Sequence, residues 1–384
     1  MDLTHVVSAD SHVAEPEAAF ARIPADLRAR FGPHFVQNPA GKKGLHFILS
    51  DHNPDAVGST FLAGTGRDPV VVKDRVENFT WDRWRGPWDP AARLGDMDRD
   101  GVSIEVLYPS IGRNLYMLHG KETPMQLAAL QSYNDWMIDY CGVAPHRLVG
   151  LCLLSVLDIE WSVQELKRCA RLGHKGATLP SVLPPGMTYM DPAFEPIWNA
   201  AEELDFPLQF HNGLRQGTER TPYYRTEPSL RDVGKRVINS AVMESTSLLL
   251  DLLFGLVLDR HPRLRVVFAE YEITWILAFF YNRIDPNAHR FGLMNPASSR
   301  FSIPPTEIIR RQVHVTFQED PAGVAGAGAI GFLDNCMWSS DYPHGSASWP
   351  NSMNIIRSQV SGFDSDTIKK LVWQNAVDFY AIAA

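Results

Sequence analysis

Short apolar runs recur along this chain and alternate with longer stretches of helical character. The runs stand at residues 5–9, 102–108, 148–154, 175–179, 206–210, 265–269, 313–317 and 336–340. The helix-like stretches lie at residues 123–140, 159–171, 192–204, 233–258, 273–284, 321–330 and 352–360. Strands that alternate with helices form a parallel sheet, and eight such units predict a (β/α)8 barrel of the TIM type.

Two regions depart from this alternation. Residues 20–90 follow the first strand and are rich in Gly, Pro and Trp. We expect them to form an insertion that caps the barrel mouth, or else a small separate domain. Residues 362–384 begin with an N-cap at Asp364 or Ser365 and are amphipathic, which predicts a closing helix. Residues 1–384 are therefore expected to form one barrel domain.

The composition excludes some classes of partner. Lys and Arg number 36 against 44 Asp and Glu, a net charge of −8, which disfavours nucleic acid and anionic membranes. Four scattered cysteines and an N-terminus without a signal-like apolar stretch predict a reduced, cytoplasmic protein. The apolar run at 248–258 is too short to span a membrane and indicates a buried or subunit-interface helix, hence a homo-oligomer, expected to be a dimer.

Polar side chains follow the carboxyl ends of five of the expected strands. They are Asp10, His12, His211, Glu270, Glu319, Asp341 and His344. Because the carboxyl ends of barrel strands meet at one mouth, we expect these side chains to lie together. Imidazole and carboxylate groups bind Zn, Mn or Fe, so the set predicts a metal site.

Strand periodicity assigns a direction to some of these side chains. Asp10 and His12 share one parity, so both can point into the barrel. Glu319 shares the parity of the apolar residues in the run 313–317 and is expected to extend an inward row. His314 has the opposite parity and is expected to face the helices.

The chain resembles the amidohydrolase-related family in four motifs: DSHVAEP at 10–16, FHNG at 210–213, HPRLRVVF at 261–268 and SSDYPH at 339–344. The branch in question includes aminocarboxymuconate-semialdehyde decarboxylase and resorcylate-type decarboxylases. The resemblance implies a metal-containing (β/α)8 barrel. By matching position, it assigns metal binding to Asp10, His12, His211 and Asp341.

The chain departs from that family at two positions. Binuclear members carry a carboxylated lysine at the end of the fourth strand, where this chain has Thr178, Leu179 and Pro180. Lys175 begins that strand, so no carbamate bridge is expected. Glu270 stands where the decarboxylase branch has an acid/base histidine.

Seven candidate ligands exceed the three or four that one metal needs. The chain also resembles a smaller branch that includes dinuclear non-haem iron oxygenases, among them the hydroxylase of the platensimycin pathway. This resemblance implies two Fe ions and an O2-dependent monooxygenase that hydroxylates a small hydrophobic substrate bearing a carboxylate, with Glu270 or Glu319 bridging the metals or shifting to open a site. One alternative is a mononuclear Zn or Mn hydrolase or non-oxidative decarboxylase, in which Asp341 or Glu270 acts as catalytic base or acid. The other is a barrel that only binds a ligand.

Four side chains are candidates for substrate binding. Arg215 and Arg225, with Tyr224, lie on the loop after the fifth strand, where a guanidinium could pair with a substrate carboxylate. A solvated basic loop is the competing interpretation. Trp84 in the insertion could line an apolar pocket, although a tryptophan can equally serve in packing.

Overall fold

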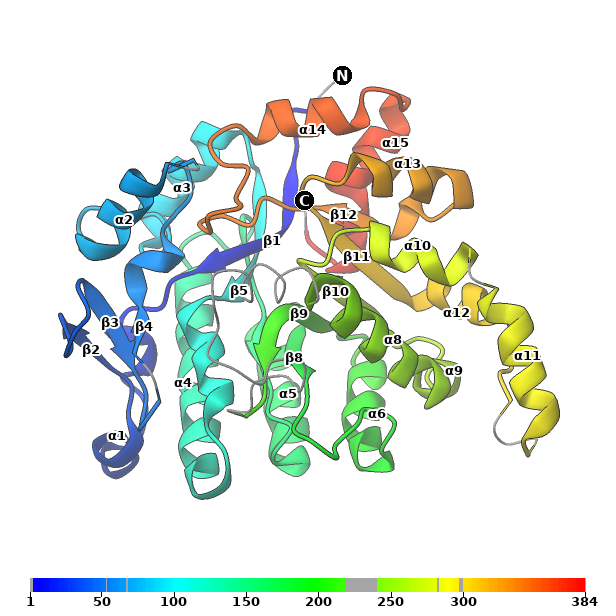
Figure 1. Cartoon of the computed structure of the whole chain (residues 1–384), viewed down its shortest axis with the longest axis horizontal. Helices are drawn as coiled ribbons and strands as arrows, with labels where there is room; N and C mark the ends of the chain where they lie inside the picture. Colours follow the sequence, from blue (N-terminus) through cyan, green and yellow to red (C-terminus); the bar gives the residue numbers. More distant parts are fainter. Residues whose placement is uncertain are drawn as a thin grey trace.

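A ring of parallel strands surrounded by helices forms the centre of the molecule (Figure 1). The computed structural model describes residues 3–52, 54–66, 68–217, 240–281, 283–296 and 300–383. The ring strands are β1 (Val7–Val13), β5 (Ile104–Pro109), β6 (Leu148–Gly150), β7 (Cys152–Leu153), β8 (Ala177–Val182), β9 (Leu208–Arg215), β10 (Val266–Ala269), β11 (Val313–Phe317) and β12 (Cys336–Trp338). The predicted TIM-like barrel is confirmed.

The strands pair in the order in which they occur along the chain. One parallel sheet runs β1-β5-β6 and a second runs β7-β8-β9-β10-β11-β12. Leu151 alone separates β6 from β7, so the third strand of the barrel is one strand interrupted at a single residue. The ring closes where the Asp341 N–H donates to the Asp10 carbonyl at 3.0 Å and the His12 N–H donates to the Tyr342 carbonyl at 2.6 Å.

Helices cover the outside of the ring. They are α3 (Pro90–Asp100), α4 (Thr123–Cys141), α5 (Ile159–Leu172), α6 (Glu195–Glu203), α8 (Ser245–Phe254), α9 (Val257–Arg260), α10 (Thr274–Tyr281), α11 (Ile284–Met294), α12 (Pro305–Gln312), α13 (Pro321–Ile330) and α14 (Ser352–Val360). Asp89, Asp158 and Asp320 cap α3, α5 and α13 by accepting hydrogen bonds from first-turn N–H groups. Each such cap contributes about 1 kcal/mol.

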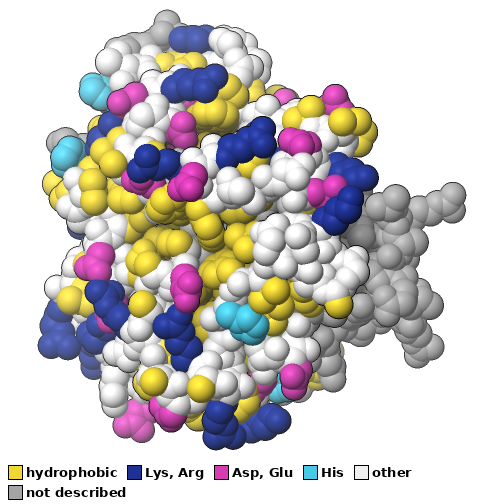
Figure 2. Space-filling view, turned by 90° about the vertical axis from the view of Figure 1, so that its left-hand side faces the viewer, with side chains coloured by type: hydrophobic (Ala, Val, Ile, Leu, Met, Phe, Trp, Pro, Cys, Tyr) yellow, Lys and Arg dark blue, Asp and Glu magenta, His cyan; other side chains and the backbone are white. Residues whose placement is uncertain are grey.

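The segment between β1 and α3 lies at one side of the barrel (Figure 1). It contains α1 (Ala25–Phe31), the antiparallel strands β2 (His34–Gln37), β3 (Leu45–Ile48) and β4 (Asp55–Ala56), the short helix η2 (Val57–Thr60) and α2 (Pro69–Glu77). Aromatic side chains pack its interior, including Phe47, Phe61 and Phe79. Figure 2 shows this face of the molecule, on which Lys and Arg side chains lie among hydrophobic ones.

The two faces of strand β11 are the reverse of what its periodicity suggested. Val313 and Val315 pair with Val266 and Phe268, and all four belong to the cluster that packs under the helices. His314 pairs with Val267 on the other face, and its ring lies 4.4 Å from that of Phe379. The prediction that His314 faces the helices is therefore wrong, because the fully apolar row of this strand is the one buried under the helix layer.

The C-terminal segment closes the end of the barrel opposite the strand ends that carry the acidic and histidine side chains. It comprises α15 (Ser365–Lys369), a π-helical turn (Lys370–Gln374) and α16 (Asn375–Phe379), and Asp364 caps it. The Tyr380 hydroxyl donates to Gln209 inside the barrel at 3.1 Å. Lys175, at the start of the fourth strand, donates to the Ala381 carbonyl and so lies at this closed end.

Three further observations concern predictions from composition. All four cysteines are buried and carry free thiols. Among the described helices, none combines the length and the apolar character that a membrane crossing requires. Helix α8 buries Leu248, Leu249, Leu252 and Leu253, whereas Leu250 is partly exposed. The cytoplasmic location and the homodimer stay predictions.

Candidate metal centre

Acidic and histidine side chains from three strands meet at the open end of the barrel. Asp10 and His12 lie on β1, His211 lies on β9, and Asp341 follows the end of β12 by three residues. In β1 the residues Val7 and Ala9 face the barrel interior, so simple alternation would point Asp10 and His12 outward. The pairing of β1 with β5 shifts register between Ser8 and Ser11, and this bulge turns both side chains inward.

Three ligand-type atoms lie within hydrogen-bonding range of one another at the base of the mouth. The Nε2 atoms of His12 and His211 are 3.1 Å apart, and Asp10 Oδ1 lies 3.3 Å from each of them. The other ring nitrogens are held from behind, because His12 Nδ1 contacts the Pro109 carbonyl at 3.0 Å and His211 Nδ1 the Asn212 carbonyl at 2.8 Å. These contacts aim both Nε2 atoms at the same point, as the outer contacts of metal-binding histidines do.

Asp341 lies close to His12 and forms a second group of ligand atoms with His12 and His344. Its Oδ1 lies 3.5 Å from His12 Nε2, and the carboxylate accepts hydrogen bonds from His344 Nδ1 at 2.7 Å and from the Ser346 hydroxyl. His344 Nε2 is itself engaged by the Ser110 hydroxyl at 3.0 Å. Because both of its nitrogens have partners, His344 is arranged to orient Asp341.

The charges of these groups are strongly coupled. Burial lowers the pKa of His12 to about 4, and repulsion from His344 adds to this effect. Burial also opposes charge on His211, but the adjacent Asp10 carboxylate outweighs it and raises the pKa of His211 to about 9. The same attraction holds the pKa of Asp10 below its ordinary value against the opposing effect of burial. The ionised Asp10 carboxylate thus lies beside two imidazoles, and it favours the charged form of His211 while burial disfavours the charged form of His12.

The donor set fits a divalent cation. Within the described residues, two groups of side chains can offer converging ligand atoms: Asp10 with His12 and His211, and His12 with Asp341 and His344. Both oxygens of the Asp10 carboxylate are buried without a well-aligned hydrogen bond. A buried carboxylate is rarely left unsatisfied, and a cation between it and the two Nε2 atoms would complete its contacts.

Glu270 borders the site. Its Oε2 lies 3.5 Å from His211 Nε2, and its side chain is 33% exposed toward the mouth. Burial of the remainder, followed by repulsion from Asp341, raises the pKa of Glu270 well above its ordinary value. Glu272 points elsewhere, and its carboxylate accepts the backbone N–H groups of Gln318 and Glu319.

Glu319 does not join these side chains. It is exposed, it belongs to neither group of converging ligands, and its backbone N–H is bound by Glu272. It continues the row of Val315 and Phe317, which faces the helices, and this explains why a ligand role inferred from an inward row fails. The structure thus brings together Asp10, His12, His211, Glu270, Asp341 and His344, but not Glu319.

A small cavity of about 200 Å³ opens above the cluster, and we call it the mouth cavity. Its lining consists of His12, Ser59, Thr60, Pro109, Arg113, His211, Asn212, Leu214, Glu270 and His344. Arg113 is a residue of the site that the sequence does not predict. It follows β5 by four residues, and this position just beyond the end of a strand is the one sequence feature that indicates a place at the barrel mouth. Its guanidinium lies 3.6 Å from Asp55 and is 46% exposed.

The two predicted substrate-binding residues that the structure describes lie away from the mouth cavity. Arg215 pairs with Glu244 and does not line the mouth cavity. Trp84 lines a different cavity, between the insertion, α3 and the loop after β12. Tyr224 and Arg225 lie outside the described residues.

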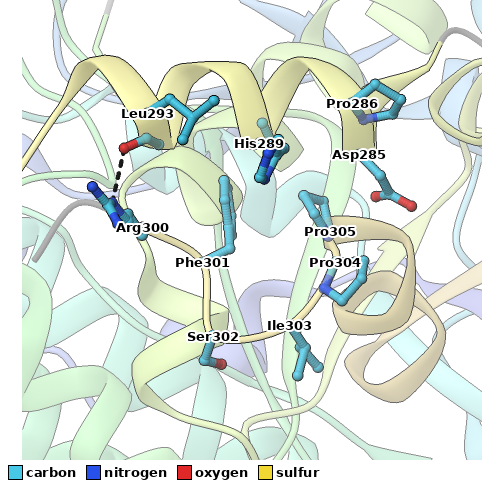
Figure 3. Close-up of a pocket in the computed structure, with 12 residues that line it drawn as sticks. Asp285, Pro286, His289, Leu293, Arg300, Phe301, Ser302, Ile303, Pro304 and Pro305 are labelled. Carbon is cyan, nitrogen blue, oxygen red and sulfur yellow. Dashed lines mark hydrogen bonds between the residues drawn. The ribbon is translucent and has the colours of Figure 1, made fainter. Parts of the chain in front are cut away.

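A roomier cavity, of about 530 Å³, lies far from this chemistry. It is formed by α11 and the segment that leads into α12 (Figure 3). Arg300 closes one end by donating to the Gly292 carbonyl at 2.8 Å, and Asp285 at the other end accepts from Thr306. This cavity contains no residue of the candidate metal centre.

Comparison with known proteins places the chain among barrel enzymes. The sequence profile of a family described as amidohydrolase matches residues 34–382. The 2-amino-3-carboxymuconate-6-semialdehyde decarboxylase of Dictyostelium discoideum is 31% identical over 185 residues, which cover 47% of each chain. The chain thus matches about half the length of the curated relatives.

Solved structures share the fold over nearly the whole chain. An amidohydrolase from Mycobacterium avium subsp. paratuberculosis K-10 superposes with a TM-score of 0.75 at 19% identity, covering 98% of this chain and 97% of that one. The 5-carboxyvanillate decarboxylase of Novosphingobium aromaticivorans DSM 12444, complexed with manganese and 4-hydroxy-3-methoxy-5-nitrobenzoic acid, gives 0.68 at 18% identity, covering 98% and 96%.

These relatives correct the functional prediction. The expected O2-dependent diiron monooxygenase is wrong, because the curated relatives are decarboxylases, and neither two iron ions nor the oxygenase branch finds support. The geometry supplies a reason. Glu319 lies outside the site, and His344 is engaged by Ser110 and Asp341. The number of side chains that remain as candidate ligands is therefore closer to what one metal ion needs.

Proposed function

We propose that this chain, which belongs to the amidohydrolase family, is a metal-dependent, non-oxidative decarboxylase of a small aromatic carboxylic acid. The observation that carries the proposal is the presence of two groups of ligand atoms that share His12, namely Asp10 with His12 and His211, and His12 with Asp341 and His344. They lie beneath a small cavity that also presents Arg113. The names of the curated relatives support the reaction class, since both are decarboxylases.

The metal is proposed to be one divalent cation, with Mn²⁺ the first choice because a structural neighbour was solved with manganese. Asp10, His12, His211 and Asp341 would hold it, and when bound it would act as a Lewis acid toward substrate oxygens. His344 keeps Asp341 in position, and Pro109 and Asn212 fix the two imidazoles through their carbonyls.

Arg113 is proposed to bind the substrate carboxylate. Its guanidinium lines the mouth cavity, and its ion pair with Asp55 is long at 3.6 Å, so a carboxylate that enters the cavity offers it a better partner. The cavity volume of about 200 Å³ lies below that of pockets for drug-sized ligands and suits a single ring. Ser59 and Thr60 close the cavity from the insertion side.

Glu270 is proposed to deliver the proton. In the reaction the bond between the ring carbon and the carboxyl carbon breaks, its electron pair stays on the ring carbon, CO2 leaves and a proton replaces it. Glu270 faces the cavity, whereas Asp341 is tied to His344 and Ser346 and does not line it. Glu270 therefore occupies the position of the acid/base histidine of the decarboxylase branch and takes over its task.

The test is an anaerobic assay of CO2 release from a panel of hydroxylated benzoic acids. The full chain is loaded with Mn²⁺, and the panel includes 2,6-dihydroxybenzoate and 5-carboxyvanillate. We expect turnover of at least one acid without O2, abolition of turnover in Asp10→Asn, and at least a tenfold increase of KM in Arg113→Gln. Lys370→Gln, a surface change at a remote ion pair, serves as the control. Turnover that requires O2, or no CO2 release from any acid, would refute the proposal.

A further inference from the structure

A second cavity, of about 380 Å³, lies between the insertion, helix α3 and the loop after β12, and we call it the basic pocket. It is lined by Phe61, Ala63, Arg75, Asp82, Arg83, Trp84, Arg85, Gly86, Pro87, Ala92, Asp96, Tyr342, Pro343 and Trp349. Its surface therefore combines three arginines with aromatic side chains. None of the proposed metal ligands lines it.

Two of the arginines gather around one tryptophan. The guanidinium carbons of Arg75 and Arg83 lie 4.4 Å and 4.5 Å from the centre of the Trp84 ring. Burial lowers the pKa of Arg75, and repulsion from Arg83 adds to the effect. Two like charges are thus held close together by a shared contact with an aromatic ring, an arrangement that an anion would stabilise.

Among the described residues, no carboxylate forms a close ion pair with Arg75 or Arg83, although the charge of Asp74 favours the charged form of Arg75. Arg85 pairs with Asp89, and Asp96 accepts a hydrogen bond from the Tyr342 hydroxyl at 2.5 Å. Asp82 lines the pocket, but it makes no ion pair with either Arg75 or Arg83 among the described residues. The hydrogen bond of Arg75 goes to the neutral Phe61 carbonyl at 2.6 Å.

The basic pocket is separate from the mouth cavity. The segment from Ser59 to Ala63 runs between them, with Ser59 and Thr60 on the mouth cavity and Phe61 and Ala63 on the basic pocket. The N–H groups of Leu62 and Ala63 donate to the Pro343 carbonyl at 3.0 Å and 2.8 Å and join this partition to the loop after β12. A small ligand can therefore occupy one cavity without entering the other.

We propose that the basic pocket is a binding site for a small organic anion, distinct from the substrate site. The anionic head, a carboxylate or a phosphate, pairs with the guanidinium groups of Arg75 and Arg83. The apolar part of the ligand packs against Tyr342, Pro343 and Trp349. The volume of the pocket falls in the range of cavities that take ligands larger than a single ring.

Isothermal titration calorimetry on the Mn²⁺-loaded full chain tests this proposal with three probes. They are 2-naphthoate, 2-naphthyl phosphate and the uncharged 2-naphthalenemethanol. The variant is Arg83→Gln, chosen because Arg83 is exposed and its loss leaves the Arg75 hydrogen bond in place. The matched control is Arg30→Gln, which removes another arginine that lies over an aromatic ring, Phe31, away from the pocket. A second comparison uses Arg113→Gln, which alters only the mouth cavity.

We expect at least one anionic probe to bind and Arg83→Gln to weaken it about tenfold or more, the effect of losing one charge-assisted hydrogen bond. Arg30→Gln and Arg113→Gln should bind it as the wild type does. Tighter binding of the naphthoate or of the phosphate identifies the preferred head. Equal binding of the uncharged probe, binding lost in Arg113→Gln but kept in Arg83→Gln, or no binding of either anion would overturn the proposal.

Discussion

Replacement of Arg93 tests how the barrel supports its own metal ligands. Arg93 is fully buried, its Nε donates to Glu105 Oε2 at 2.5 Å, and its Nη1 donates to the His12 carbonyl at 2.6 Å. Arg93→Met leaves the Glu105 carboxylate buried without its cation. Removing one partner of a buried ion pair costs about 3–5 kcal/mol, because the remaining charge stays unsolvated.

The size of the thermal shift follows from the length of the chain. For 384 residues the unfolding entropy implies a change of about 1.2 °C per kcal/mol, so Arg93→Met should lower Tm by roughly 4–6 °C. The double variant Arg93→Met/Glu105→Leu replaces both groups by apolar side chains and should recover most of this loss. Scanning calorimetry of the wild type, both single variants and the double variant completes the cycle.

One outcome of this cycle would refute the reasoning. If the double variant is destabilised by the sum of the two single changes, the pair does not interact and the buried charge is not what costs stability. Arg93→Lys adds a functional readout. Lysine keeps a positive charge near Glu105 but lacks the rigid guanidinium that also holds the His12 carbonyl. Arg93→Lys should therefore weaken Mn²⁺ binding while lowering Tm less than Arg93→Met does.

Three further predictions concern single residues. Asp10→Asn should weaken Mn²⁺ binding by more than about tenfold, as measured by metal retained after dialysis. Glu270→Gln should lower kcat by roughly 10²–10⁴ while the metal content stays unchanged, and unchanged kcat would contradict its role as proton donor. Burial raises the pKa of Glu15 to about 7, so its contribution to stability is fully present below pH ~4.5 and is lost as the pH rises through ~7. Chemical denaturation at pH 5 and pH 8 should show roughly 3 kcal/mol of this loss in wild type and none in Glu15→Gln.

The fold could be predicted because each barrel unit carries its own local signal. Helices α4, α5 and α13 begin at the predicted residues, since their starts coincide with Pro or with an Asp cap. The long helix expected at 233–258 shows the limit. Within its described part it breaks at Gly255 and Leu256, where Leu256 adopts a left-handed φ of 56° that apolar periodicity does not signal.

Which strand faces look inward could not be predicted from alternation alone. In β11 both faces offered a plausible inner row, and only the pairing of Val315 with Phe268 reveals which row lies under the helices. The assignment of Glu319 failed for this reason. Asp10 and His12 point inward because a bulge between Ser8 and Ser11 reverses the alternation, a feature with no sequence signal in this strand.

The residues that shape the site break strand regularity where it matters most. Glu270 and Asp341 adopt φ values of 60° and 55°, a left-handed conformation that costs of order 1–3 kcal/mol in a residue with a side chain. The surrounding structure holds each in place: the Glu270 N–H donates to the Thr316 hydroxyl at 3.0 Å, and the Asp341 N–H to the Asp10 carbonyl at 3.0 Å. If β10 and β12 continued as regular strands, these two carboxylates would follow the in-and-out alternation of the strand side chains. The turned backbone brings Glu270 beside His211 and Asp341 beside His12. In the proposed reaction, Glu270 replaces the acid/base histidine of the decarboxylase branch, and its hydrogen bond to Thr316 on the neighbouring strand fixes its backbone conformation.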